Sequence, residues 1–364
     1  LDGSPPGYYY RPGVGEQANS WILFFQGGGW CYTGLNAPKN DGCVARSTSP
    51  TGTSLNWAPT VEPGRLEGGG GFLSGEDAIA KGFANFTVVY LNYCDGGSFT
   101  GNLDTTVESN GTTLHFRGKA NLDAVVHDIR EKYGFKEAKE VVVSGCSAGG
   151  MACYLHVDYI ADEVAPVPTR GVCDAGMFLD VENIVGEGDI MWQRFSNVVD
   201  IMNSTLPRRC VEALAPNSSR CIFSQNALQH LVTPTFMIQS LNNFMSWDEL
   251  TTITNYTIPD SWTNCIPHLM GLTPTSYLNC TAEQKQAILE YHNTLLAVTH
   301  TAVDPSTPHG VFGDACPGDH CQTSSGWSTR LVGGVIMSDA VNDWYFKGAQ
   351  MKLVDPPFPS NPTC

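Results

Sequence analysis

The feature that most constrains the fold is a strand-like run that leads directly into a motif of small residues. Val141 to Val143 precede Gly145-Cys146-Ser147-Ala148-Gly149, and residues 151–164 can form a helix. Gly-x-Ser-x-Gly between a strand and a helix is typical of a nucleophile elbow, where larger side chains at the glycines would collide with neighbouring elements. We therefore predict Ser147 as a nucleophile, with the N–H of Ala148 as an oxyanion donor.

Short apolar runs predict the rest of the core. The runs are residues 21–25, 86–91, 140–144 and 234–238. Unbroken apolar runs are typical of strands covered on both faces, as in a mostly parallel sheet. Residues 119–132 carry apolar side chains at helical spacing, which predicts an amphipathic crossover helix. Strands alternating with helices indicate an α/β fold with right-handed crossovers and helices on both faces.

The length of 364 residues fits one enlarged domain, because no repeat or long linker divides it. We expect a single domain over residues 1–364. Residues 181–232 and 244–300 are less regular and are interpreted as helical or loop insertions above the site. Residues 95–115 are expected to form a long loop after a strand, with a mobile surface loop as the plain interpretation.

The 13 cysteines favour an oxidising compartment. They lack the paired Cys-x-x-Cys sets of structural zinc sites, and their odd number leaves at least one thiol free or paired elsewhere. Short separations make four loops plausible: Cys31–Cys43, Cys210–Cys221, Cys265–Cys280 and Cys316–Cys321. Sequons for N-glycosylation occur at Asn85, Asn110, Asn203, Asn217, Asn255 and Asn279. Together these features predict a secreted, N-glycosylated protein.

The net charge of −16 argues against nucleic acid and anionic membranes as partners, since no basic cluster offsets it. No run approaches the length of a membrane-spanning helix, and the start at Leu1 suggests a mature or trimmed product.

Residues 68–71 lack the Lys-Ser/Thr of a phosphate loop and are interpreted as a flexible turn. Asp314 and Asp319 are interpreted as solvated acids, so we expect no metal and no cofactor. We also expect a monomer.

Two further groups are needed for serine chemistry. Gln26-Gly27-Gly28-Gly29-Trp30 follows the first apolar run, and its glycines allow the backbone to approach a substrate carbonyl. Gly28 and Gly29 are therefore candidate oxyanion donors. The base is expected downstream of the nucleophile, where His320 lies in a Cys-, Gly- and Pro-rich segment. His309 and His300 are local alternatives.

These residues resemble the pectin acetylesterase family, which includes esterases related to the lipid deacylase Notum. The resemblance runs from residue 1 to about 325. It is carried by Leu1-Asp2-Gly3-Ser4-Pro5-Pro6-Gly7-Tyr8, Gly27-Gly28-Gly29-Trp30-Cys31, Tyr93-Cys94-Asp95-Gly96-Gly97-Ser98-Phe99-Thr100-Gly101, His115-Phe116-Arg117-Gly118, Gly145-Cys146-Ser147-Ala148-Gly149-Gly150, and Asp174-Ala175-Gly176 with Phe178-Leu179-Asp180.

The resemblance implies an α/β-hydrolase-like core, a serine esterase mechanism without a cofactor, and an oxyanion hole formed by Gly28, Gly29 and Ala148. It favours His320 as the base, because Cys316-x-x-x-His320-Cys321 matches the family's motif. The third member of the triad departs from the pattern. Residues 234–243 place Asn243 where the family has an aspartate, and Asp248 follows five residues later. Either residue orients the base, or the site is weakened.

Three functions follow from this resemblance. The favoured one is a secreted carboxylic ester hydrolase that removes O-acetyl groups from a pectin-like polysaccharide. The alternatives are a fatty-acyl or protein O-deacylase of the Notum type and a catalytically weakened, carbohydrate-binding scaffold.

Substrate contacts are expected from Trp30 and Tyr93, with Phe178 as a further wall of a short acyl pocket. An acidic protein that acts on a polyanion needs a local cationic site. Arg117 is the candidate for that site, together with Arg65 or Arg46.

Overall fold

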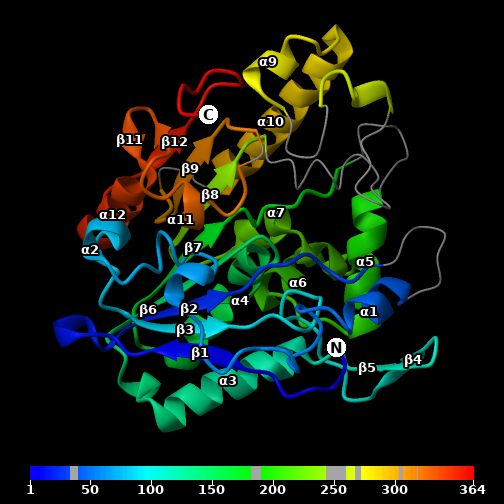
Figure 1. Ribbon diagram of the computed structural model, residues 1–364, viewed down its shortest axis with the longest axis vertical. Coiled ribbons are helices and arrows are strands. Elements are labelled where there is room, and N and C mark those ends of the chain that lie inside the picture. The colour runs from blue at the N-terminus through cyan, green and yellow to red at the C-terminus, as the bar shows by residue number, and fades with distance from the viewer. Residues whose placement is uncertain (33–39, 182–189, 243–259, 267–271, 303–305, 318) are drawn as a thin grey trace.

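An eight-stranded sheet forms the centre of the protein. The computed structural model describes residues 1–364 except 33–39, 182–189, 243–259, 267–271, 303–305 and 318. In spatial order the strands are β1 (Tyr8–Arg11), β3 (Thr87–Leu91), β2 (Ser20–Phe25), β6 (Glu140–Cys146), β7 (Thr169–Asp174), β8 (Thr235–Ser240), β9 (Gly310–Asp314) and β12 (Lys352–Val354). Within this sheet β1 pairs antiparallel with β3, and the remaining strands pair in parallel (Figure 1). The predicted mostly parallel sheet is confirmed.

The four predicted apolar runs are the strands β2, β3, β6 and β8. β2 shows why they lack an apolar/polar alternation. Trp21, Leu23 and Phe25 enter the core on one face of the sheet, whereas Ile22 and Phe24 enter a second core on the other. All five are at most 2% exposed, so every position must be apolar. The sequence analysis missed β1, β7, β9 and β12, which are short or interrupted by glycine and charged residues.

Helices cover both faces of the sheet, as predicted. The longer ones are α3 (Gly118–Lys132), α4 (Ala148–Val164), α5 (Ile190–Met202), α6 (Arg208–Leu214), α10 (Ala282–Ala302) and α12 (Met337–Lys347). Short helices are α1 (Asp41–Arg46), α2 (Asp77–Ala80), α7 (Ser224–Ala227), α9 (Pro274–Tyr277) and α11 (Gln322–Ser325). Buried side chains of α3, α4 and α10 share one core, and those of α2 and α12 share the other. Among the helices in the described ranges, none is long and apolar enough to cross a bilayer.

Residues 95–106 lie in a loop after β3, as expected, but the first part of this loop is not exposed at the surface. The stretch 95–101 is buried, and Asp95 stabilises it because its Oδ2 accepts the N–H groups of Gly97 and Phe99 at 3.2 and 3.1 Å. A buried carboxylate that accepts two backbone donors fixes a tight turn. The rest of the segment contains a small hairpin of β4 (Val107–Ser109) and β5 (Thr112–Leu114). A second hairpin joins β10 (Leu331–Val332) to β11 (Val335–Ile336).

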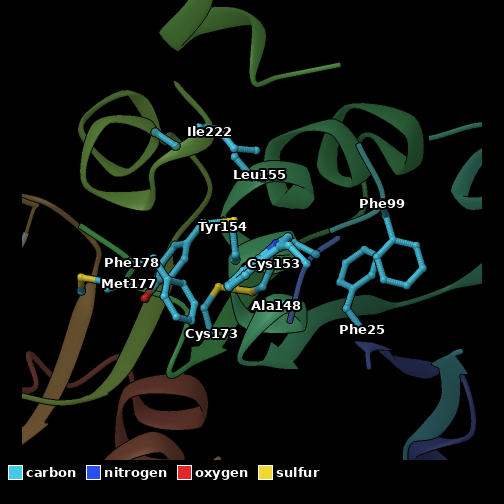
Figure 2. Close-up of a cluster of buried hydrophobic side chains, with 14 of the residues drawn as sticks. Phe25, Phe99, Ala148, Cys153, Tyr154, Leu155, Cys173, Met177, Phe178 and Ile222 are labelled. Atoms are coloured by element: carbon cyan, nitrogen blue, oxygen red, sulfur yellow. A yellow bond between two sulfur atoms is a disulfide. The ribbon is translucent and has the colours of Figure 1, made fainter. Parts of the chain in front are cut away.

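Six disulfides crosslink the protein, with sequence separations from 11 to 175 residues. Three of the four expected short loops are present: Cys31–Cys43, Cys210–Cys221 and Cys265–Cys280. The expected Cys316–Cys321 pair is wrong, because Cys316 bonds to Cys364 and Cys321 bonds to Cys146. Cys153–Cys173 joins α4 to β7 under the site (Figure 2). The thirteenth cysteine, Cys94, has no disulfide partner and is a buried free thiol.

Candidate active site

Ser147 lies on the turn between β6 and α4. Its backbone angles, φ 61° and ψ −125°, fall in a region that non-glycine residues rarely adopt. The turn is held in place because the N–H of Ser147 donates to the Asp174 carbonyl at 3.1 Å. Its own carbonyl accepts the N–H of Met151 at 2.9 Å, which closes the first turn of α4. The strained residue is therefore fixed at the carboxyl end of the sheet.

The flanking glycines are required by close backbone contacts. A β-carbon on Gly145 would lie 2.4 Å from the Gly149 carbonyl oxygen, and one on Gly149 would lie 2.0 Å from that of Phe25. Real β-carbons do not approach so closely, so larger residues at either position would push the elbow away from β2. The physical reason given for the motif in the sequence therefore holds in the structure.

The structure brings His320 beside the elbow. A ring nitrogen of His320 and the sulfurs of Cys146 and Cys321 all lie within 4.8 Å of one another, and Cys146 immediately precedes Ser147. Burial lowers the pKa of His320 to about 4, so the imidazole is neutral at higher pH, as a general base must be.

The two alternative histidines lie elsewhere. His309 precedes β9, and its Nδ1 accepts the N–H of Thr235, the first residue of β8, at 3.1 Å. It therefore lies at the amino end of these parallel strands, opposite Ser147. His300 belongs to α10, and its side chain lies outside the described residues.

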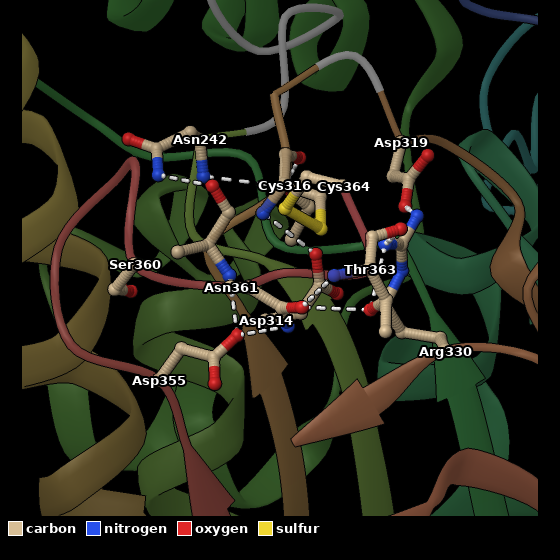
Figure 3. The surroundings of a disulfide bond; sticks show 12 residues. Asn242, Asp314, Cys316, Asp319, Arg330, Asp355, Ser360, Asn361, Thr363 and Cys364 are labelled. Atoms are coloured by element: carbon tan, nitrogen blue, oxygen red, sulfur yellow. Dashed lines mark hydrogen bonds and ion pairs between the residues drawn. A yellow bond between two sulfur atoms is a disulfide. The ribbon is translucent and has the colours of Figure 1, made fainter. Parts of the chain in front are cut away.

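Two buried aspartates hold the segment that carries His320. Asp174 Oδ2 accepts both the N–H and the hydroxyl of Thr323 at 2.7 Å. Asp314 accepts the Cys316 N–H at 2.9 Å and the side-chain amide of Gln322 at 2.6 Å. Burial raises the pKa of each aspartate to about 6. The Cys316–Cys364 disulfide lies among these contacts (Figure 3), so the chain is held at residues 314–316 before His320 and at residues 322–323 after it.

Among the described residues, two groups of side chains have the spacing of a metal site, but bonds within each group do not match one. In the cluster of Cys146, His320 and Cys321 the two sulfurs are bonded to each other, so neither is a thiolate. The second group is Asp314, Cys316 and Asp319. Its cysteine is in a disulfide and its Asp319 pairs with Arg330, which does not match a cation site.

Gly28 and Gly29 lie on the loop after β2 with φ of 133° and 69°, which favours glycine. Arg46 Nη2 donates to the Gly28 carbonyl at 2.7 Å, and the Tyr93 hydroxyl donates to the Gly29 carbonyl at 2.9 Å. In a trans peptide, the carbonyl of one residue and the N–H of the next residue point in opposite directions. The contact at the Gly28 carbonyl therefore fixes the direction of the Gly29 N–H, and the contact at the Gly29 carbonyl fixes that of the Trp30 N–H. Arg46 thereby orients the N–H of Gly29.

A buried chain of hydrogen bonds joins this loop to the elbow. Trp30 Nε1 donates to Ser98 Oγ at 2.7 Å, and that hydroxyl donates to the Ala148 carbonyl at 2.7 Å. Ala148 is the first residue of α4, where the helix leaves its leading N–H groups without intrahelical acceptors. The three predicted oxyanion donors are therefore on segments that are physically coupled.

The Tyr93→Phe variant is expected to lower kcat about tenfold with little change in KM, because it removes the hydroxyl that ties the Gly29 carbonyl to the Ser98 N–H and so loosens the loop that carries the oxyanion donors. Steady-state kinetics on an acetyl ester measures this change. Tyr9→Phe is the matched control, since it removes a hydroxyl that donates to the Ala58 carbonyl in another loop. Equal kinetics for the two variants would contradict a positioning role for Tyr93.

Trp30, Tyr93 and Arg117, the other residues expected to contact substrate, differ in their exposure to solvent. Trp30 is 8% exposed, and its ring packs edge-on against Phe178 and Phe195 with centroids 4.5 and 4.8 Å apart. Tyr93 is fully buried, so its contacts favour a structural task over direct substrate contact. Arg117 is exposed at the start of α3 and donates to the Asp104 carbonyl at 3.2 Å.

Asn243 and Asp248, the two candidates for the third triad member, lie outside the described residues. They follow β8 in sequence. The last described residue before them, Asn242, is 1% exposed, and its side-chain amide donates to the Ala315 carbonyl at 3.0 Å. This contact joins the end of β8 to the segment that leads to His320 (Figure 3).

Sequence reasoning missed Glu67. The four glycines that follow it were interpreted as a flexible turn, but Gly68 and Gly69 are buried and the Gly68 N–H donates to Ser324 Oγ at 2.6 Å. Glu67 Oε2 accepts the Gly27 N–H at 2.7 Å, directly before the candidate oxyanion residues. Nothing local in the sequence indicates this contact, because the two residues are 40 positions apart.

Comparisons with known proteins agree with this geometry. A family model described as "Pectinacetylesterase" matches residues 1–364. Pectin acetylesterase 5 of Arabidopsis thaliana is 31% identical over 376 residues, which cover 100% of this chain and 81% of that protein. The human palmitoleoyl-protein carboxylesterase NOTUM is 25% identical, over 100% of this chain and 70% of that protein. The solved structure of the Wnt deacylase Notum from Drosophila has a TM-score of 0.76 at 21% identity, over 100% of this chain and 94% of that one.

Proposed function

Because the chain belongs to the pectinacetylesterase family and is a carboxylesterase, we propose that it removes O-acetyl groups from a pectin-like polysaccharide through an acyl-enzyme on Ser147. The observation that carries this proposal is the elbow itself: Ser147 at positive φ, beside His320, at the amino end of α4. The substrate class comes from the acetylesterase relatives, and the mechanism comes from the site.

The proposed reaction begins when Ser147 Oγ attacks the acetyl carbonyl while His320 takes its proton. The N–H groups of Gly28, Gly29 and Ala148 stabilise the oxyanion of the tetrahedral intermediate. His320 then returns the proton to the departing sugar hydroxyl as the C–O bond breaks, which leaves an acetyl-enzyme. Water, deprotonated by His320, attacks this ester; the bond to Ser147 Oγ then breaks, His320 returns the proton to that oxygen, and acetate leaves. Asn243 or Asp248 is the proposed orienting partner of His320.

A short acyl group is supported by the aromatic side chains beside the hole. Trp30, Phe178 and Phe195 pack on one another, and each is at most 8% exposed. Phe178 also packs among the side chains of α4 and the segment after β7 (Figure 2). Rings that fill space in this way favour an acetyl group over a long chain.

The substrate's charge calls for local recognition, because the protein carries a net charge of −16. Arg46 is half-buried on the Gly28 carbonyl, and its guanidinium also lies 5.1 Å from the Tyr93 ring centroid. Its contacts are structural, which leaves the exposed Arg65 and Arg117 as the proposed cationic contacts for a uronate chain.

A panel of chromogenic esters from acetyl to palmitoyl tests the substrate class. We expect kcat/KM to be highest for acetyl and to fall at least about tenfold for chains of eight carbons or more, because the aromatic cluster excludes them. A preference for long chains would instead support a fatty-acyl or protein deacylase, the class named for the NOTUM relatives. No turnover of any ester by the wild type would support a weakened, carbohydrate-binding scaffold.

We also propose that the protein works outside the cell as a monomer. The six disulfides fit an oxidising compartment. Five sequon asparagines are exposed, namely Asn85, Asn110, Asn203, Asn217 and Asn279, and Asn255 lies outside the described residues. N-glycosylation stays a prediction, which the mass of the secreted protein before and after glycan removal tests.

A further inference from the structure

Glu67 has a place in the site that the mechanism above leaves unused. It follows the turn Pro63–Arg65 and precedes the buried glycine turn that packs on residues 323–324. Its Oε2 accepts the Gly27 N–H at 2.7 Å. Its Oε1 and the β-carbon of Ser147 both lie within 3.3 Å of the point where a β-carbon on Gly27 would sit. The carboxyl group is therefore next to both the nucleophile and the oxyanion loop.

The surroundings of Glu67 favour its neutral form. Burial raises the pKa of Glu67 to about 7, the Gly27 N–H opposes this shift, and the charge of Asp174 adds to it. Among the residues that the structure describes, the titratable groups facing it are Asp174 at the end of β7 and Tyr90 on β3. Asp174 ionises first because Thr323 donates two hydrogen bonds to it.

We propose that Glu67 is a positioning residue of the oxyanion loop and that its ionisation lowers the rate of ester hydrolysis on the alkaline side. This inference rests on the proposed roles of Ser147 and of the loop that carries Gly28 and Gly29. The Gly27 N–H has an acceptor oxygen whether or not Glu67 is protonated, so the loop keeps its position. Only the charge changes, and a carboxylate beside the developing oxyanion opposes the negative charge of the transition state.

Ionised Glu67 does not offset this loss of rate by making His320 a stronger base. Burial is the cause of the low pKa of His320, and among the described residues Glu67 is not one of the groups that shift it. Activity therefore needs neutral His320, present above about pH 4, and neutral Glu67, present below about pH 7. Ionisation of Glu67, which lies against the Gly27 N–H and beside Ser147, therefore sets the alkaline limit of activity.

The pH profile of kcat/KM on an acetyl ester tests this assignment with three proteins. The wild type is expected to lose about tenfold between pH 6 and 8.5, whereas Glu67→Gln keeps its activity over that range. Glu62→Gln is the matched control, since it removes an exposed carboxylate from the same segment and is expected to follow the wild type. Superimposable profiles for Glu67→Gln and wild type would overturn the proposal.

Glu67→Ala separates the positioning role from the charge. It removes the acceptor of the Gly27 N–H, so kcat is expected to fall about tenfold at pH 6 with KM nearly unchanged. Glu67→Gln keeps an acceptor oxygen and is expected to restore kcat. If the alanine and glutamine variants were equally active at pH 6, Glu67 would not position the loop.

A stability measurement keeps this inference distinct from the proposed function. The pKa of Glu67 is about 7 in the folded chain and 4.5 ordinarily. Between pH 4.5 and 7 the folded chain therefore holds a proton that the unfolded chain lacks. The unfolding midpoint of the wild type should therefore fall relative to that of Glu67→Gln as pH rises from 4.5 to 7. If the wild type hydrolysed no ester, the proposed function would fail, yet this trend would still support the titration of Glu67. A pH-independent difference would overturn it.

Discussion

Ser147→Ala is expected to lower kcat/KM for an acetyl ester by at least about four orders of magnitude, because no acyl-enzyme can form without the hydroxyl. Alanine fits the same backbone, whose positive φ is imposed by the Asp174 carbonyl and by α4. The variant should therefore keep the wild-type unfolding midpoint and still bind acetylated polysaccharide. Steady-state kinetics together with mass spectrometry of a fluorophosphonate-treated sample measures the loss of both turnover and covalent labelling.

Ser144→Ala is the control for this variant. It removes a buried hydroxyl three residues upstream on β6, which donates to the Val172 carbonyl at 2.7 Å. We expect it to cost stability but to leave labelling at Ser147 intact. Wild-type turnover by Ser147→Ala would show that another group carries the reaction.

Removing the Cys146–Cys321 disulfide is expected to have the second largest effect, on both stability and activity. The bond joins the residue before Ser147 to the residue after His320, across a sequence separation of 175. In the chain-entropy model such a loop contributes about 5 kcal/mol to the free energy of unfolding. The double variant Cys146→Ala/Cys321→Ala should also lose about tenfold in kcat, because the base segment then has no covalent link to the elbow.

The matched control removes Cys265–Cys280, which closes a loop of sequence separation 15 near the start of α10. Here the same model gives about 3 kcal/mol, and kcat should not change. Denaturant unfolding and steady-state kinetics on both double variants separate the two effects. Equal kcat for both would mean that the Cys146–Cys321 bond does not hold the base in position.

Local sequence patterns predicted those parts of the protein whose structure depends on residues that are neighbours in the chain. The strand before Ser147, the elbow and the start of α4 are contiguous, and the residues that force the turn are Gly145 and Gly149. The buried strands were found for the same reason, since burial on both faces requires unbroken apolar runs. The position of His320 needed the family resemblance as well, because histidine alone carries no local signature.

Contacts between distant segments explain what the sequence analysis missed. Cys316 and Cys321 are close in sequence, but the ends of β6 and β9 bring other partners nearer in space. Glu67 reaches Gly27 only because the glycine turn packs on residues 323–324. Likewise, Asp95 converts an apparently mobile polar segment into a buried turn. None of these contacts leaves a periodic pattern in the chain.

The disulfide connectivity also has a consequence for how the protein can be produced. During oxidative folding, thiols that are near in sequence meet most often, so Cys316 and Cys321 would tend to bond to each other before finding partners 48 and 175 residues away. That early bond must be exchanged by a thiolate. Once the chain has folded, Cys94 is poorly suited to attack these disulfides, because it is 4% exposed and burial raises its pKa to about 11. A host compartment that supplies a catalyst of thiol–disulfide exchange is therefore expected to raise the yield of correctly paired enzyme.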